Sequence, residues 1–440
     1  MLRDQARIRE GAAGYLVEEI RRISSPLQTI ADLDPLIERI GGARFVLLGE
    51  ASHGTFEYYQ WRARLSLRLI EEKGFNFVSV EGDWPDCYRV NRYVKGYPDA
   101  GESARNVLHA FKRWPTWMWA NWEIVAFAEW LRAYNQNRSV KAGFYGLDVY
   151  SLWESMESIL NYLEKRDPEA VQTALEAYRC FEPYGEDIQS YAWSTRLVPD
   201  TCEDEVIELL LEMQRQANRY DGDPEASFNA EQNALVIKNA EHYYRAMVQT
   251  NSDSWNVRDQ HMMETLNRLM VFHGPGTKGI VWAHNTHVGD ARYTDMSRAG
   301  MLNIGQLARE QHRDDGVVLA GFGSHHGSVI AGKSWGAPME RMQVPEAREG
   351  SWEDVLHQAG GDQLVLFDQD NISDEIKKPR GQRAIGVVYH AEAESYGNYV
   401  PTILPKRYDA FLYIDETEAL HPLHIEPEEL KSPDTYPWGV

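Results

Sequence analysis

The sequence predicts an α/β protein with a mostly parallel central sheet flanked by helices and a largely helical insertion. Two observations carry this fold class. Short, continuous apolar runs that are bounded by glycine or charged residues are typical of strands buried on both faces of a parallel sheet. One long stretch, at about residues 150–272, instead has helical spacing.

The N-terminal part supplies a first strand–helix–strand unit. Residues 14–40 have helical spacing, and the run RFVLLGE at 44–50 predicts a buried strand. Residues 55–74 predict a helix that Gly74 ends, and a second buried strand follows at 75–84. A unit of this length suits the right-handed crossover between two parallel strands.

Six further apolar runs predict later strands. They lie at residues 140–148, 278–287, 316–326, 362–368, 383–390 and 408–416. The predicted helices of the insertion, at about 150–272, fall between the first two of these runs. No internal repeat or low-complexity linker separates the parts, so we expect a single domain over residues 1–440.

Charge and hydropathy restrict the class of partner. The chain carries a net charge of −22 and no basic cluster longer than IKKPR, so nucleic acid would be repelled and a small-molecule substrate is favoured. The amphipathic N-terminal segment lacks the apolar core of a secretory signal. No apolar run approaches the roughly 20 residues that span a membrane. We expect a soluble cytoplasmic protein; the oligomeric state stays open.

The cysteines favour the same compartment. Cys87, Cys180 and Cys202 are odd in number and share no C-x-x-C spacing. This pattern argues against a disulfide framework and against a zinc ribbon. The sequence therefore predicts a chain without disulfides in a reducing cytoplasm.

Five predicted strands end in side chains capable of acid–base or metal chemistry. The carboxyl ends of parallel strands meet at one edge of the sheet, where ligands bind, so these side chains are expected to converge. They are Glu50 and His53, Glu81 and Asp83, Asp148, His284 and His287, and His325 and His326. One such ending would suit a helix cap; five make a shared site the favoured interpretation.

The stretch LLGEASHGTFEYYQWR at 47–62 disfavours two kinds of site. It is not a phosphate loop, since Glu50 and His53 stand where close backbone approach needs glycine. A serine-hydrolase elbow reads G-x-S-x-G, whereas here Glu50 replaces the first glycine. Ser52 is therefore disfavoured as a nucleophile, and we expect it to cap the following helix.

Two chemistries remain. A metal site is one alternative, because histidines and carboxylates at the strand ends offer nitrogen and oxygen ligands. The favoured interpretation is a metal-free general base, with a carboxylate such as Glu50 holding His53 in the tautomer that accepts a proton from water. A cationic group must then meet the developing oxyanion, and Arg62 in the predicted helix could face the crevice.

Aromatic residues offer a wall for a large ligand. The segment RWPTWMWANWE places Trp114, Trp117, Trp119 and Trp122 close together. Core packing is the alternative for these tryptophans, and it is the one we favour. Tyr396 and Tyr399 lie in a polar loop that we expect at the surface.

Six segments together resemble the erythromycin esterase-like family, in the family's order. They are LGEASHGTFEYYQWRARL, VSVEGDWPDCYRVNRYV, FKRWPTWMWANWE, FYGLDVYSLWESM, NVRDQHMMETL and WAHNTHVGD. The resemblance covers residues from about 40 to 300, with looser similarity to about 420. It implies a soluble α/β hydrolase with a deep cleft that opens a macrolide lactone by attack of water, without a metal or another cofactor.

The resemblance also implies roles for single residues. His53 would be the general base, with Glu50 and Glu81 orienting and polarising it. His284 and Arg62 would assist by binding the substrate carbonyl or the water. Asp259 lies in a matching motif without an assigned step. The residues expected to contact the substrate are Asp148, His287, Arg258, Trp117 and Trp119.

The wider superfamily leaves two rival functions open. One is a metal-dependent hydrolase or peptidase with a divalent ion at His53, Glu81 and His284. The other is a non-enzymatic protein that binds haem or another large ligand, although the chain lacks a lipoprotein signal. The sequence does not distinguish a macrolide from a polysaccharide ester or another lactone as substrate.

Overall fold

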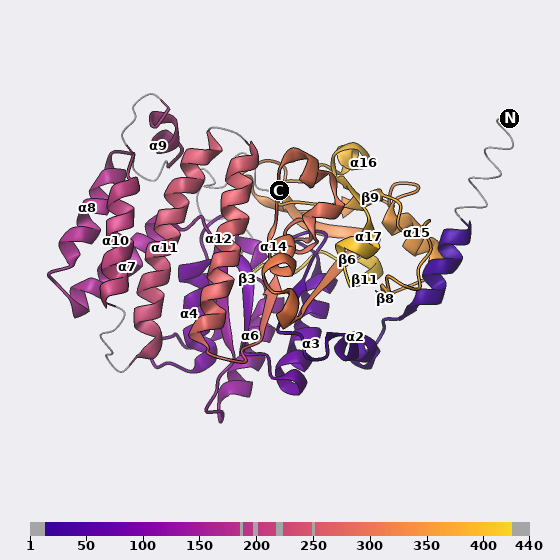
Figure 1. The fold of residues 1–440 in the computed structure, drawn as a ribbon, viewed down its shortest axis with the longest axis horizontal. Coiled ribbons are helices and arrows are strands. Elements are labelled where there is room, and N and C mark those ends of the chain that lie inside the picture. Colours follow the sequence, from indigo (N-terminus) through magenta and orange to yellow (C-terminus); the bar gives the residue numbers. More distant parts are fainter. Residues whose placement is uncertain (1–13, 185–187, 197–200, 217–222, 249–250, 425–440) are drawn as a thin grey trace.

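A nine-stranded mixed sheet forms the centre of the molecule (Figure 1). The computed structural model describes residues 14–184, 188–196, 201–216, 223–248 and 251–424. The strand order is β1-β8-β11-β6-β2-β5-β3-β4, and β7 pairs with β6 outside this path. Helices flank the sheet, so the predicted α/β class with a mostly parallel sheet is confirmed.

Six neighbouring strands of this sheet run parallel. They are β11 (Ala410–Thr417), β6 (Val317–Gly332), β2 (Phe45–Leu48), β5 (Gly279–Trp282), β3 (Phe77–Asp83) and β4 (Gly143–Asp148). Every residue of β2, β4 and β5 is buried, which explains why these strands read as continuous apolar runs. Their carboxyl ends share one edge of the sheet.

The remaining strands lie at the margins. Antiparallel pairing adds β1 (Ser24–Pro26), β8 (Gln363–Leu366) and β7 (Met339–Val344) to the main sheet. A separate antiparallel pair is formed by β9 (Arg380–Arg383) and β10 (Tyr399–Thr402). None of these marginal strands except β8 was predicted, since they are short or half-exposed.

One predicted strand is wrong. Of residues 383–390 only Arg383 belongs to a strand, and the rest form an irregular segment. Ile385 and Tyr389 are nevertheless buried, because they pack on Val329 and Ala331 of β6. The apolar residues of this segment are therefore buried because they pack against the sheet, although the segment is not one of its strands.

Helices cover the sheet and close its connections. Outside the insertion they are residues 14–23, α2 (Asp34–Ile40), α3 (Phe56–Lys73), α4 (Trp84–Lys95), α5 (Ala104–His109), α6 (Trp122–Asn135), α13 (Asn285–Val288), α14 (Ile304–Gln311), α15 (Trp352–Ala359), α16 (Glu394–Gly397) and α17 (Leu404–Arg407). Short 3₁₀ turns are η1 (Ile30–Leu33), η2 (Thr116–Met118), η3 (Glu182–Tyr184), η4 (Ala291–Tyr293), η5 (Asp295–Ala299), η6 (Arg313–Asp315) and η7 (Ala391–Ala393). Helix α3 ends as predicted at Gly74, whose φ of 69° is the left-handed conformation that glycine adopts readily.

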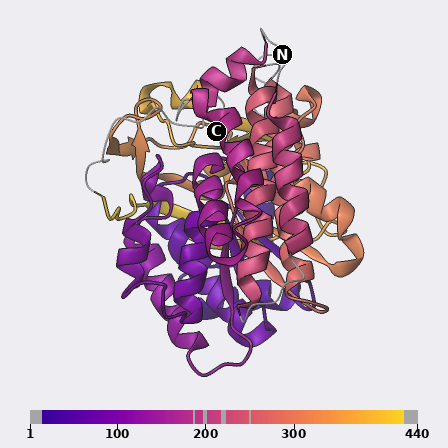
Figure 2. The same ribbon diagram turned by 90° about the vertical axis from the view of Figure 1, so that its left-hand side faces the viewer.

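Between β4 and β5 the described residues form helices and no strand. The helices are α7 (Leu152–Arg166), α8 (Val171–Phe181), α9 (Ile188–Ser194), α10 (Glu203–Gln216), α11 (Pro224–Met247) and α12 (Asn251–Phe272). They lie to one side of the sheet and share a hydrophobic core of their own (Figures 1 and 2). Helix α12 packs on β4, and this contact carries residues of the insertion to the carboxyl edge of the sheet.

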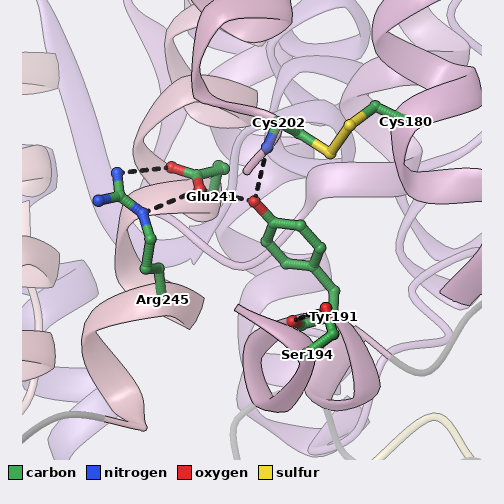
Figure 3. The surroundings of a disulfide bond; sticks show 6 residues. All are labelled: Cys180, Tyr191, Ser194, Cys202, Glu241 and Arg245. Atoms are coloured by element: carbon green, nitrogen blue, oxygen red, sulfur yellow. Dashed lines mark hydrogen bonds and ion pairs between the residues drawn. A yellow bond between two sulfur atoms is a disulfide. The ribbon is translucent and has the colours of Figure 1, made fainter. Parts of the chain in front are cut away.

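A disulfide joins two helices of the insertion, against the prediction from the cysteine count. Cys180 at the end of α8 is bonded to Cys202, which directly precedes α10. Figure 3 shows the surroundings: the Cys202 amide donates to the Tyr191 hydroxyl, which in turn donates to Glu241. Two cysteines 22 residues apart on separate helices meet only through tertiary packing. The cysteine argument for a reducing cytoplasm therefore falls away, and Cys87 is the free, buried thiol.

The helices in the described part of the chain include none that is both long and apolar enough to cross a bilayer. The longest, α11, has 24 residues and contains charged side chains such as Glu231, Lys238 and Glu241. Burial of this helix comes from packing on its neighbours α7, α10 and α12.

Candidate active site

The carboxyl ends of four neighbouring strands bring a set of buried polar side chains together. Glu50 and His53 follow β2, Glu81 lies in β3, Asp148 ends β4 and His284 follows β5. All five side chains are buried. The convergence expected from the strand endings is therefore present for four of the five predicted strands. The fifth ending was wrong, because β6 continues past His325 and His326 to Gly332 and neither histidine lines the pocket described below.

Glu50 links an arginine to the histidine of the same motif. Its Oε1 lies 2.9 Å from His53 Nδ1, and its Oε2 accepts from Arg62 Nη2 at 2.7 Å. The Arg62 guanidinium packs over the rings of Tyr59 and Trp282, 4.4 and 5.0 Å from their centroids. Because the carboxylate is an acceptor only, His53 Nδ1 carries a proton and its Nε2 is left as the basic atom.

Glu81 occupies the centre of the cluster. Its Oε1 accepts from Arg258 Nη2 at 2.7 Å, and its Oε2 accepts from the His284 amide at 2.8 Å. His53 Nε2 lies 3.9 Å from the same Oε1. Burial disfavours the charge of Glu81, but the imidazoles of His287 and His53, when protonated, and the guanidinium of Arg258 outweigh it and lower the pKa of this carboxyl. Glu81 is thus an anion that faces the basic atom of His53.

Arg258 comes from α12 of the insertion and neutralises two acids of the sheet. Its Nε and Nη2 donate to the two oxygens of Asp148 at 2.9 and 2.7 Å. The guanidinium also lies 4.9 Å from the ring centroid of Tyr150. This bidentate contact fixes the guanidinium plane at the edge of the sheet.

His287 also faces Glu81, with its Nε2 3.4 Å from Oε1 of that carboxylate. Arginine donates only, so the 3.0 Å contact from Arg258 Nη1 makes His287 Nε2 an acceptor. The proton then sits on Nδ1, which lies 2.9 Å from Asp259 Oδ2. Trp255 stacks on the imidazole with centroids 4.5 Å apart. These contacts orient the ring that supports Arg258.

His284 is neutral and carries its proton on Nε2. Burial lowers the pKa of this imidazole well below its usual value. Its Nδ1 accepts from the Thr286 amide at 3.3 Å, so the proton lies on Nε2, which has no hydrogen-bond partner among the described residues. The ring lies 4.9 Å from that of His53, centroid to centroid. An unpaired N–H donor therefore stands next to the basic histidine.

A pocket opens over this cluster. The space between its walls is about 640 Å³, part of which is open solvent, and its polar lining includes His53, Glu81, Asp148 and Arg258. The aromatic lining consists of Phe111, Trp114, Trp119, Tyr150 and Trp335. A largely apolar pocket with a few convergent polar groups is typical of a site for a small organic molecule.

Gly82 allows the indole of Trp119 to pack closely against the end of β3. Trp119 Nε1 donates to the Glu81 carbonyl at 2.9 Å and passes over Gly82. A Cβ at position 82 would lie 2.7 Å from that indole nitrogen, closer than packing allows. The sequence Glu81-Gly82 thus places an indole and a carboxylate side by side.

The pKa of His53 depends on its two acidic neighbours, Glu81 and Glu50. Burial opposes the positive charge on the ring, but Glu81 and then Glu50 outweigh it and raise the pKa of His53 above 6.5. His53 accepts a proton only in its neutral form, so the raised pKa moves the onset of its action as a base to higher pH.

The predicted residues divide into those that face the pocket and those behind it. His53, Glu81, Asp148, Arg258 and Trp119 line the pocket. Five others contact this lining or pack in the core without lining the pocket themselves: Glu50, Arg62, His284, His287 and Trp117. The expectation that Arg62 meets the substrate finds no support in its position, because it lies behind Glu50.

The tryptophans of RWPTWMWANWE include both pocket-lining and core residues, the two roles that the sequence left open. Trp114 and Trp119 line the pocket, whereas Trp117 is buried in the core at 5.4 Å from the Trp114 ring. Trp122 is half-exposed at the start of α6. Tyr396 is exposed, as predicted for a surface loop, and Tyr399 lies in β10; neither lines the pocket.

Several pocket residues had no signal in the sequence. Arg113 pairs with Asp83 at 2.6 Å and with Glu154 at 2.5 Å, and it lines the pocket beside Asp83. Trp335 and Val387 come from irregular segments far along the chain. Of these four residues, the sequence indicated Asp83 alone, by its place at the end of a predicted strand.

The alternative chemistries fit the geometry less well. The Ser52 hydroxyl hydrogen bonds to the Thr55 hydroxyl and does not line the pocket. The N-cap of α3 is Thr55, so the predicted capping role of Ser52 is wrong. Within the described chain, His53, Glu81 and His284 do not form a group of three whose ligand atoms approach within 4.8 Å. Their arrangement therefore does not fit a preformed metal centre.

Comparisons with known proteins point to one family. The profile described as Erythromycin esterase matches residues 70–417. Erythromycin esterase type II of Escherichia coli is 23% identical over 399 residues, which cover 85% of this chain and 92% of that protein. A mutant of the erythromycin esterase EreC in its open conformation has the same fold, with a TM-score of 0.65, 19% identity, and coverage of 89% of this chain and 95% of that one.

A third relative carries a different name. A crystal structure described as a succinoglycan biosynthesis protein is 23% identical, with a TM-score of 0.73 and coverage of 93% of this chain and 98% of that one. At this identity the likeness shows the fold. The family profile begins at residue 70, so Glu50, His53 and Arg62 precede it, whereas Glu81, Asp148 and Arg258 lie inside it. Since the profile spans most of the sequence, this chain belongs to the erythromycin esterase family.

Proposed function

We propose that the protein is a hydrolase that cleaves a macrolide lactone or a related ester with a water molecule activated by His53. The observation that carries this proposal is the series Arg62–Glu50–His53. It ends at the pocket with His53 Nε2 free to accept a proton. Each member fixes the next, so the imidazole is held in one orientation and one tautomer.

The proposed reaction uses two proton transfers. His53 Nε2 takes a proton from water as the water oxygen bonds to the ester carbonyl carbon. The bond from this carbon to the ester oxygen then breaks, and the protonated His53 returns its proton to the departing alkoxide. The positive charge of Arg258, which lines the pocket, suits the stabilisation of the oxyanion. His284 lies behind His53 and does not line the pocket, so its contribution is to position the ring of His53.

A reaction without a metal is part of this proposal. Arg258 already donates to Glu81 and to both oxygens of Asp148, so the acids that would attract a divalent ion are paired with a guanidinium. The cation that the site needs is therefore supplied by the chain itself.

Macrolides are proposed as substrates for two reasons. Two of the relatives are named erythromycin esterases. The aromatic side chains Phe111, Trp114 and Trp335 give the pocket an apolar wall that suits a large, mostly apolar ring.

The proposal is tested by incubating the protein with erythromycin and with simple aryl esters, followed by mass spectrometry. We expect a product heavier than the macrolide by one water, at a rate that is unchanged after treatment with a chelator. Loss of turnover with the chelator and its return with a divalent ion would overturn the metal-free mechanism. Absence of hydrolysis of every macrolide and ester would overturn the assignment as an esterase.

The pH profile should report the contact between Glu81 and His53. The base acts in its neutral form, and its pKa is raised, so kcat/KM should rise with pH through a value above 6.5. Glu81→Gln removes the largest charge that raises this pKa, so the acidic limb of the remaining activity should shift to lower pH. The matched control is Asp86→Asn, an acid of the same pocket that is not among the main groups that shift the pKa of His53. An acidic limb that stays in place in Glu81→Gln would contradict the assignment of His53 as the base.

A further inference from the structure

A second cluster of ligating side chains lies outside the pocket. Among the described residues, His325, His357 and Asp415 form the group of three histidine or acidic side chains whose ligand atoms all lie within 4.8 Å of one another. None of the three lines the pocket. We propose that they form a binding site for a divalent transition-metal ion, of which Zn²⁺ is the best match.

The fold brings these residues together from three elements. His325 lies in β6 and Asp415 in β11, between the paired positions Ser324↔Ile414 and His326↔Glu416 of two parallel strands. Neighbours at the same register point to the same face of a sheet. Helix α15 packs on both strands and contributes His357. A bound ion would therefore join this helix to the carboxyl edge of the sheet.

The distances place the ligand atoms close to the geometry of a metal centre. His357 Nδ1 lies 2.7 Å from Asp415 Oδ1, and the rings of His325 and His357 are stacked with centroids 3.8 Å apart. Metal–ligand bonds to zinc are about 2.0–2.2 Å long for nitrogen and oxygen. Because the two imidazole rings are stacked and nearly parallel, one of them must turn for both nitrogens to face the same ion. Binding would replace the His357–Asp415 hydrogen bond with a bond from each residue to the ion, and the proton on His357 Nδ1 would move to Nε2 or to solvent.

The donor set selects the class of ion. Two imidazoles and one carboxylate suit Zn²⁺ and neighbouring transition metals, whereas Mg²⁺ and Ca²⁺ prefer oxygen ligands. Three protein ligands leave the fourth position of a tetrahedral ion to water. The Tyr413 hydroxyl donates to Asp415 Oδ1 at 2.7 Å and would orient this carboxylate from outside the ligand shell.

Charge and exposure also favour a cation here. The Asp415 amide donates to the carboxylate of Asp362 at 2.9 Å, so a second acid lies beside the proposed ligand. The side chains of His357 and Asp415 are 42% and 28% exposed, which leaves the ion a path from solvent. His325 is buried and forms the inner side of the site.

The test measures Zn²⁺ binding to the untagged, full-length protein by calorimetry after dialysis against a chelator. We expect about one ion per chain that is lost, or bound at least 100-fold more weakly, in His325→Ala/His357→Ala, since removal of even outer-shell partners costs 10–100-fold. The conservative variant Asp415→Asn should weaken binding without loss of the fold. Zn²⁺ should also raise the Tm of the wild type and not that of the double variant.

Two control variants separate this site from other histidines. His421→Ala removes a histidine that pairs with Glu123 at 2.6 Å, and His53→Ala removes the proposed base. Zn²⁺ binding retained in both controls and lost in the double variant supports the proposal. Wild-type protein that binds no Zn²⁺ at micromolar concentrations, or a double variant that binds as the wild type does, would overturn it. Neither result bears on ester hydrolysis, which is measured separately.

Discussion

His53→Ala is expected to lower ester hydrolysis by about 10²–10⁴-fold, the usual contribution of a positioned general base. Alanine removes the atom that accepts the proton of water, while Glu50 keeps its ion pair with Arg62. The small side chain creates a buried cavity beside polar groups, so a modest loss of stability accompanies the loss of activity. Turnover is measured by the mass gain of one water on the substrate, and folding by circular dichroism.

The matched control for this variant is His390→Ala. His390 is a half-exposed histidine next to the acid Glu392 and does not line the pocket. Its removal should leave kcat/KM within a factor of two of the wild type. Undiminished turnover in a folded His53→Ala protein would remove the proposed mechanism and redirect attention to Glu81 as the base.

Arg258→Met is expected to have the largest effect on stability. The substitution keeps the length of the side chain but leaves Glu81 and Asp148 as buried carboxylates without their cation. Removal of one partner from a buried ion pair costs about 3–5 kcal/mol, because the remaining charge is uncompensated. The free energy of unfolding, measured with urea, should fall by this amount, and hydrolysis should be lost as well.

A second substitution tests the cause of this loss. Adding Asp148→Asn to Arg258→Met removes one of the stranded charges, so part of the lost stability should return. Arg215→Met, at an exposed arginine of the same insertion, should change stability by less than about 1 kcal/mol. If the double variant is as unstable as the sum of the two single losses, the effect of Arg258 lies in packing rather than in charge.

The strand endings were the most informative signal in the sequence. Glu50, Glu81 and Asp148 follow short apolar runs, and burial on both sheet faces leaves little choice for such runs except a central parallel strand. Because these strands are parallel neighbours, the residues at their ends meet. The parallel order of the strands therefore brings residues that are far apart in the sequence into one site. The same rule placed His325 at the end of a strand, whereas β6 continues to Gly332, and it did not indicate His357 or Asp415 as neighbours of His325.

Contacts between distant segments were beyond the sequence. Arg258 lies 110 residues from Asp148, and no local pattern in α12 marks the carboxylates that this side chain meets. Arg62 faces Glu50 rather than the crevice, a difference that depends on the rotation of α3 against the sheet. Cys180 and Cys202 are paired by the packing of α8 and α10, which a cysteine count does not report.

The disulfide also changes what a cut in the chain would do. The segment from Cys180 to Cys202 contains α9, and its two ends are covalently joined. A single cleavage within this segment would leave one molecule of unchanged mass apart from the added water, until a reductant separates the two fragments. The strands that carry Glu81 and Asp148 and the helix that carries Arg258 lie on opposite sides of that cut, at residues 77–148 and 251–272. In oxidising surroundings the bond therefore protects the connection between the two halves of the catalytic cluster.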